Sequence, residues 1–234
     1  MRFLLVLIVL TALAAAAWWQ FEERIPRHWH PWAPLHVDDP LTPVTKWKLH
    51  RLAEDREGCL AALATVPEGA LRMTPLDDHE PVSGCPLENV VRVHGSEVEF
   101  NASFVARCPL ALALAWVMYE RQRLQPAAEA HFDTRVARVE HFGSFACRNV
   151  YGREGGRLSE HATAEALDVA AFQLADGRRI TLIDHWDDAD ARGDFLRDAR
   201  DGACDLFGNV LGPEYNRAHA DHFHFGMRGF RLCR

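Results

Sequence analysis

Apolar residues recur with helical spacing in three parts of the chain. The first part covers residues 45–63, and its inward stripe consists of Leu49, Leu52, Leu60 and Leu63. The second covers residues 109–124, where the apolar positions are expected to face the core. The third begins after Asp187 and Asp188, which would cap it, and continues to about Cys204. These patterns predict three helices.

Other segments alternate with a period of two, which is typical of strands. Residues 136–145 form one such segment. Two hairpins are also predicted, and their strands cover residues 90–93 with 98–100 and residues 166–174 with 179–185. The first would turn at His94, Gly95 and Ser96, and the second at Asp176 and Gly177, a strong hairpin signal. We therefore expect an α+β domain with a central antiparallel sheet flanked by helices.

The first 43 residues have a different pattern. Residues 1–19 contain Arg2, an apolar stretch over residues 3–17 and paired tryptophans, and 17 helical residues would reach about 26 Å, slightly short of a hydrocarbon core of about 30 Å. The segment is either an uncleaved membrane anchor, which we favour, or a signal peptide cleaved after the small residues 14–16. Residues 20–43 are rich in Pro and Trp and predict an extended tether, so the domain would cover residues 44–234.

Composition and charge narrow the classes of partner. Apolar residues make up 48% of the chain and charged residues 25%, which suits a globular protein with a real core. The net charge is −7 and no basic run occurs, so nucleic acid is excluded as a partner. Six cysteines follow the apolar segment, namely Cys59, Cys85, Cys108, Cys147, Cys204 and Cys233. An even number in an exported chain predicts three disulfides, and of these only a local Cys59–Cys85 link is predicted individually.

Two runs near the end of the chain carry the candidate chemistry. Residues 159–168 offer His161 and Asp168, and residues 221–224 offer two more imidazoles, the ligand types of hydrolytic zinc sites. In one helix His161 and Asp168 would lie about 10.5 Å apart along the axis, too far for bonds of about 2.0–2.2 Å to one ion. The chain must therefore turn between them. The hairpin prediction agrees, because it places Asp168 on a strand and His161 in the loop before it.

The His-x-His run has the alternation of a strand. His222 and His224 would share one face, about 6.6 Å apart, while Phe223 and its neighbour Phe225 would form the apolar face. A polar face of this kind, next to a carboxylate strand, suits a metal site. Before it, the irregular stretch over residues 148–157 contains three glycines and is a reasonable substrate rim.

These motifs resemble those of known families. The pattern Ser-x-His-x-x-small-x-Ala-x-Asp, followed by His-x-His, is similar to that of the zinc D-Ala-D-Ala carboxypeptidases and murein endopeptidases. The resemblance implies that Zn²⁺ is bound by His161, Asp168 and His224. Those families usually have Gly where this chain has Ala164.

A second resemblance covers about residues 55–234. It is to the bacterial extensin-like C-terminal domain family, and it is carried by Cys147-Arg148, Ser159-Glu160-His161-Ala162, residues 207–213, Asp221-His222-Phe223-His224 and Cys233-Arg234. It implies a disulfide-stabilised, hedgehog/DD-peptidase-like fold with a metallopeptidase-type site. It also implies a periplasmic protein, held at the inner membrane by the N-terminal segment unless that segment is cleaved.

The leading hypothesis is a zinc hydrolase that cleaves an amide bond in peptidoglycan peptides. His222 would act as general base or transition-state donor, since a fourth protein ligand would leave no place for water. Arg148 would hold a substrate carboxylate or the developing oxyanion, as an Arg does in the related peptidases. Glu160 and Asp184 are rival bases.

Three further residues are expected around the ligands. Ser159 would either support the Asp168 carboxylate or cap a local turn. His219 and Asp221 are expected in the outer shell or in solvent. Two alternatives to an enzyme remain: a non-catalytic module that binds a cell-wall polymer and keeps a structural zinc, and a membrane-tethered scaffold without metal, held together by its disulfides.

Overall fold

Nine strands form one sheet in the described part of the chain, a computed structural model that covers residues 4, 6–13, 24–52, 55–108, 112–229 and 232–234. These strands are β1 (Leu71–Pro75), β4 (Val90–Ser96), β5 (Glu99–Arg107), β6 (Val136–Gly143), β7 (Ala166–Leu174), β8 (Arg179–Thr181), β9 (Asn209–Leu211), β10 (Phe223–Gly226) and β11 (Leu232–Cys233). They join in the order β1-β4-β5-β6-β7-β10-β9-β11, and β8 pairs with β7. A separate two-stranded sheet consists of β2 (His79–Val82) and β3 (Cys85–Leu87).

The sheet is mixed, so the predicted antiparallel sheet is wrong in this respect. Strand β5 pairs with β6 in parallel, and β9 pairs with β11 in parallel. Parallel neighbours need a long crossover connection, and the chain between β5 and β6 supplies one in the form of helices. The remaining pairs, including β4 with β5 and β7 with β10, are antiparallel.

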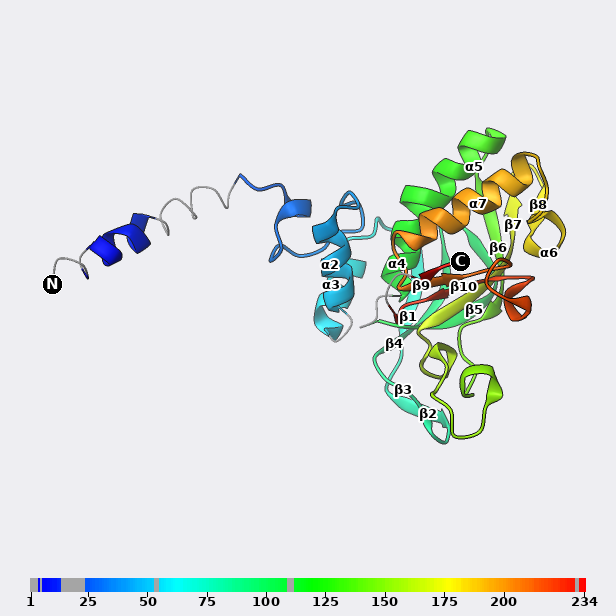
Figure 1. Cartoon of the computed structure of the whole chain (residues 1–234), viewed down its shortest axis with the longest axis horizontal. Helices are drawn as coiled ribbons and strands as arrows, with labels where there is room; N and C mark the ends of the chain where they lie inside the picture. Colours follow the sequence, from blue (N-terminus) through cyan, green and yellow to red (C-terminus); the bar gives the residue numbers. More distant parts are fainter. Residues whose placement is uncertain (1–3, 5, 14–23, 53–54, 109–111, 230–231) are drawn as a thin grey trace.

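Helices cover one face of this sheet. Besides the helical residues 6–13, the α-helices described are α2 (Pro43–Arg51), α3 (Arg56–Leu63), α4 (Leu112–Tyr119), α5 (Gln125–Phe132), α6 (Leu182–His185) and α7 (Ala191–Cys204). Figure 1 shows α4, α5 and α7 along the same face, and the β2–β3 hairpin extending away from the sheet. The core between helices and sheet is rich in aromatic residues, the largest of which are Trp116, Tyr119, Phe172, Phe195, Phe223 and Phe225. An α+β class is therefore confirmed.

Two predicted helices have different bounds in the structure. The helix expected over residues 45–63 is two helices, because Asp55 accepts a hydrogen bond from the Gly58 amide and starts α3 afresh. The helix expected over residues 109–124 continues to Phe132, and its residues 109–111 lie outside the described part. Residues 120–124 form a π-helical turn that ends two residues before Pro126. Proline lacks an N–H and its ring crowds the preceding turn, so the regular ladder is interrupted there.

Three turn predictions also shift. Strand β4 runs through residues 94–96, and the first hairpin turns at Glu97 and Val98, because an irregular register at Gly95 keeps it paired with Glu99. The second hairpin forms, but its return strand ends at Thr181, whose side chain caps α6. Helix α7 begins after Asp190, not after residues 187–188; the Asp190 carboxylate accepts from the Arg192 amide.

The segment before α2 packs partly onto the domain. Leu35 and Val37 are buried and belong to the main core, whereas Trp29 and Trp32 are exposed. The alanines 14–16 and the tryptophans at 18 and 19 lie outside the described residues. Within the described residues no helix has the length and apolar character needed to span a membrane. The domain boundary at residue 44 stays a prediction.

Three disulfides hold distant parts of the chain together. They are Cys59–Cys108, Cys85–Cys147 and Cys204–Cys233. The prediction of three disulfides is confirmed, and the predicted local Cys59–Cys85 link is wrong. Cys59 on α3 meets Cys108 just after β5, while the projecting hairpin carries Cys85 to the residue before Arg148.

A buried carboxyl group makes stability depend on pH. Glu120 is 1% exposed and accepts a hydrogen bond from the Trp116 indole N–H, and burial raises its pKa to about 7. The unfolded chain releases this proton near pH 4.5 and the folded protein keeps it to about pH 7, so the free energy of unfolding falls as pH rises through this window. The free energy of unfolding of Glu120→Gln should therefore be about 3 kcal/mol higher than that of the wild type at pH 8. Near pH 4 the two values should be equal.

Urea unfolding at both pH values measures this difference. Glu129→Gln, an exposed position on α5, is the control and should leave the pH dependence unchanged. Parallel pH profiles for Glu120→Gln and the wild type would contradict the assignment.

Candidate metal centre

Strands β7 and β10 place two of the predicted ligands opposite each other. Asp168 and His224 are direct partners in the antiparallel register of these strands. On β10 the flanking Phe223 and Phe225 point into the helix-covered core, where Phe225 contacts Tyr119 of α4. The alternation of the strand therefore sends His224 to the opposite face, and Asp168 lies beside it.

A tight turn brings the third predicted ligand to the same place. Residues 160–163 form a 3-10 turn, and Ser159 caps it by accepting a hydrogen bond from the His161 amide at 3.3 Å. The turn ends at Ala164 in the left-handed region, with φ 54° and ψ 40°. Gly adopts this conformation without strain, and Ala adopts it here at some cost. The chain thus reverses between His161 and Asp168.

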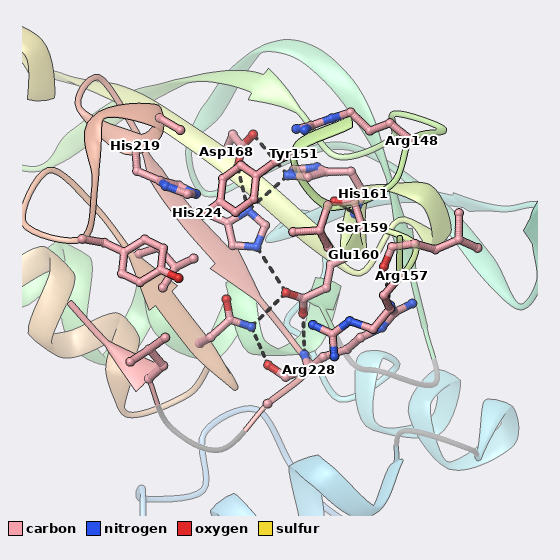
Figure 2. A pocket seen from close by; sticks show the side chains of 18 of the residues that line it. Arg148, Tyr151, Arg157, Ser159, Glu160, His161, Asp168, His219, His224 and Arg228 are labelled. Atoms are coloured by element: carbon pink, nitrogen blue, oxygen red, sulfur yellow. Dashed lines mark hydrogen bonds and ion pairs between the residues drawn. The ribbon is translucent and has the colours of Figure 1, made fainter. Parts of the chain in front are cut away.

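The three side chains converge on one point (Figure 2). His161 Nε2 lies 3.1 Å from His224 Nδ1. The Asp168 carboxylate lies 3.0 Å from His224 Nδ1 through Oδ1 and 3.2 Å from His161 Nε2 through Oδ2. Donors bound tetrahedrally to zinc at about 2.0–2.1 Å would lie about 3.3 Å from one another. The observed separations are close to the edges of such a tetrahedron.

The outer nitrogens of both imidazoles are already engaged. His161 Nδ1 lies 3.2 Å from the Ser144 carbonyl oxygen, and His224 Nε2 lies 3.3 Å from Glu160 Oε2. Each outer nitrogen can therefore donate its N–H, which leaves the inner nitrogens as bare acceptors facing the Asp168 carboxylate. In that tautomeric state three acceptors face one another, an arrangement that a bound cation would stabilise. Two imidazoles and a carboxylate fit a divalent transition ion such as Zn²⁺.

The same charges determine how His224 and Asp168 titrate without a metal. Burial favours the neutral form of His224, but the hydrogen bonds to Asp168 and Glu160 outweigh it and raise the pKa of His224 to about 9. Burial likewise favours protonation of Asp168, yet the hydrogen bonds from His161 and His224 hold its pKa well below the usual range. A metal ion entering this site must therefore displace a proton from His224.

The centre lies in a cavity of about 440 Å³. Of the residues predicted from the sequence, the cavity lining includes His161, Asp168, His224, Arg148, Ser159, Glu160, His219 and His222. Asp184 does not line it; this residue lies in α6 and accepts a hydrogen bond from the Thr181 hydroxyl. Asp184 thus lies outside the cavity that holds the three candidate ligands. Ser159 accepts a hydrogen bond from the His161 amide, which agrees with the alternative that it caps a local turn.

Two further histidines stand beside the ligands. His222 Nε2 is 3.6 Å from Asp168 Oδ1, and its Nδ1 is 2.8 Å from the Asp221 carboxylate, to which it can donate. His222 precedes β10 and remains close to the centre. Burial, together with the neighbouring His222 and His224, lowers the pKa of His219 to about 4. His219 is therefore neutral at pH 7, and its Nδ1 lies 2.9 Å from the Asn216 side-chain oxygen.

Tyr151 and Arg157 line the cavity and belong to the stretch 148–157, which was predicted as a substrate rim. Three further polar lining residues, Asn209, Tyr215 and Arg228, were not singled out from the sequence. Asn209 belongs to a string already noted for its resemblance to a family, which was a usable signal. Nothing in the local sequence marks Arg228, because its contacts to Glu165 and Thr163 come from distant segments.

A second group of possible ligands does not qualify. Asp201, Cys204 and Cys233 lie within reach of one another, but the two cysteines are joined in a disulfide and have no thiolate to offer. Among the described residues the centre formed by His161, Asp168 and His224 is thus the stronger metal candidate.

Comparison with known proteins defines the family. The family model described as extensin-like protein C-terminus matches residues 57–234, more than half of the chain. The chain therefore belongs to this family, and the resemblance noted from its motifs is confirmed to that extent. No curated protein and no solved structure matches it.

Proposed function

We propose that this protein is a zinc-dependent hydrolase of the cell envelope that cleaves an amide bond in peptidoglycan peptides. One observation carries the proposal: His161, Asp168 and His224 converge with near-tetrahedral spacing in the lining of an accessible cavity. Three protein ligands are the number found in catalytic zinc sites, whereas structural sites usually have four. Zinc bound there would polarise a carbonyl group and lower the pKa of a water molecule toward neutrality.

The chain supplies groups for the remaining steps. His222, held by Asp221 through Nδ1, has Nε2 available near Asp168 and can accept a proton there. Arg148 at the rim of the cavity has no carboxylate partner among the described residues, which leaves its guanidinium available for a substrate carboxylate. Neutral His219 also lines the cavity, with its ring next to that of His222.

The proposal includes the fold relationship and the location. A hedgehog/DD-peptidase-like arrangement is supported by the mixed sheet with a His-turn-Asp segment paired to a His strand. Three disulfides are typical of proteins in an oxidising compartment and support a periplasmic location as part of the proposal. The N-terminal segment would hold it at the inner membrane.

Digestion of purified muropeptides tests the activity. Zinc-loaded protein should release shortened or uncrosslinked peptides, detected by mass spectrometry, and a chelator should prevent this. His222→Ala should retain zinc and lose most of the cleavage, while Asp184→Asn, outside the cavity, should cleave as the wild type does. No cleavage by protein that holds one zinc per chain would contradict the proposal and favour a cell-wall binding module.

A further inference from the structure

The carboxylate of Glu160 is surrounded by nitrogen donors. Its Oε1 accepts a hydrogen bond from the Arg228 amide at 2.6 Å. Its Oε2 accepts from the Asn209 side chain at 2.9 Å and from His224 Nε2 at 3.3 Å (Figure 2). The side chain is only 13% exposed. Both carboxylate oxygens therefore accept hydrogen bonds from groups of the protein.

The position of Glu160 separates it from the reacting side of the centre. It touches Nε2 of His224, whereas Asp168 and His161 face Nδ1 of the same ring. The imidazole thus stands between the Glu160 carboxylate and the point where the ligand atoms meet. A general base must lie within hydrogen-bond reach of the proton that it removes. Glu160 does not meet this condition, and the prediction that it is a catalytic base is replaced.

Space for this carboxylate depends on a glycine. Gly226 lies two residues after His224 on β10, and hence on the same face, and it pairs with Asn209 of β9. A Cβ atom at Gly226 would lie 2.6 Å from Asn209 Nδ2 and 2.6–2.7 Å from the two Glu160 oxygens. These separations are shorter than any ordinary carbon contact. The close approach of Glu160 to the strand therefore requires a residue without a side chain.

We propose that Glu160, held by Asn209 in the space left by Gly226, is the positioning residue of His224. It keeps the imidazole proton on Nε2 and thereby turns the Nδ1 lone pair toward Asp168 and His161. Hydrogen bonds from a carboxylate to the outer nitrogen of a metal-binding histidine fix its tautomer and ring orientation. The inference rests on the metal centre of the proposed function and concerns zinc affinity, not the bond that is cleaved.

Zinc affinity of matched glutamine variants tests the inference. Glu160→Gln retains shape but offers one acceptor oxygen to three donors, so the dissociation constant for Zn²⁺ should rise about 10- to 100-fold in competition with a chelating dye. Glu165→Gln is the control: Glu165 is 2% exposed and also contacts Arg228, but its other partner is Arg107, away from His224. Its zinc affinity should stay within about threefold of the wild type.

A spectroscopic readout separates positioning from general stability. In zinc-loaded protein labelled with ¹⁵N-histidine, His224 should coordinate through Nδ1 and carry its proton on Nε2. In Glu160→Gln the signal of Nδ1-coordinated His224 should weaken, or signals of both tautomers should be present. Gly226→Ala, if it folds, should give the same spectrum as Glu160→Gln. Unchanged Nδ1 coordination together with equal zinc affinity in Glu160→Gln and Glu165→Gln would overturn the inference. Failure of cleavage alone would bear only on the proposed function.

Discussion

His161→Ala and His224→Ala are each expected to abolish stoichiometric zinc binding. The centre has only three protein donors, and structural zinc sites with four release about 10–16 kcal/mol. One ligand is therefore worth about 3 kcal/mol or more, so its loss should weaken binding at least about a hundredfold. Metal analysis of purified domain should find near one zinc per wild-type chain and almost none in either variant.

The matched control is another histidine. His131→Ala removes an imidazole on α5 that pairs with Asp198 and stands outside the cavity, so zinc content should not change. Full retention of zinc by His161→Ala would contradict the assigned ligand set.

The pH dependence of zinc affinity follows from the raised pKa of His224. Below about pH 9 the metal-free His224 imidazole, which lies between Asp168 and Glu160, is protonated on both nitrogens. Zinc must displace the proton on Nδ1. Affinity should therefore fall about tenfold for each pH unit between pH 8 and pH 7. Calorimetry in buffers of different ionisation enthalpy should detect about one proton released per zinc; a pH-independent affinity would contradict this charge arrangement.

Removal of the Cys85–Cys147 disulfide should have the second large effect. Its half-cystines are separated by 62 residues in the sequence, and closing a loop of this length in the unfolded chain predicts a stabilisation of about 4 kcal/mol. The free energy of unfolding of the double Cys→Ser variant, measured with a denaturant, should be lower than that of the wild type by about this amount. It should also lose muropeptide cleavage, because the disulfide anchors Cys147, the residue directly before Arg148 at the cavity rim.

The Cys204–Cys233 pair provides the comparison. Its separation of 29 residues predicts a loss of about 3.5 kcal/mol, but it joins α7 to β11 and does not anchor the segment that carries Arg148. Its double variant should lose stability and keep more of the cleavage. A change below about 1 kcal/mol in the Cys85–Cys147 variant would contradict a stabilising role.

Local pattern was sufficient for the elements that carry the candidate metal centre. The alternation of imidazole and phenyl groups in residues 222–225 predicts a strand with one apolar face, and Phe223 and Phe225 are buried as expected. Asp168 lies on the strand and His161 in the preceding turn, also as expected. These features depend on residues a few positions apart, where periodicity and turn chemistry are informative.

Features set by long-range packing could not be read in the same way. The parallel pairing of β5 with β6 depends on where the intervening helices pack, and the disulfide partners depend on the direction in which the β2–β3 hairpin projects. The contacts of Glu160 are of the same kind, since Asn209 and Gly226 meet it only through the pairing of β9 with β10. Sequence alone therefore identified Glu160 as a site residue, but not the contacts on which the proposed positioning role depends.

Anomalous X-ray diffraction at the zinc edge, from crystals of the zinc-loaded domain, tests the metal centre most directly. We predict one strong peak bonded to His161 Nε2, His224 Nδ1 and the Asp168 carboxylate, at about 2.0–2.2 Å from each. A peak bonded to other residues, or none in crystals grown with excess zinc, would contradict the account.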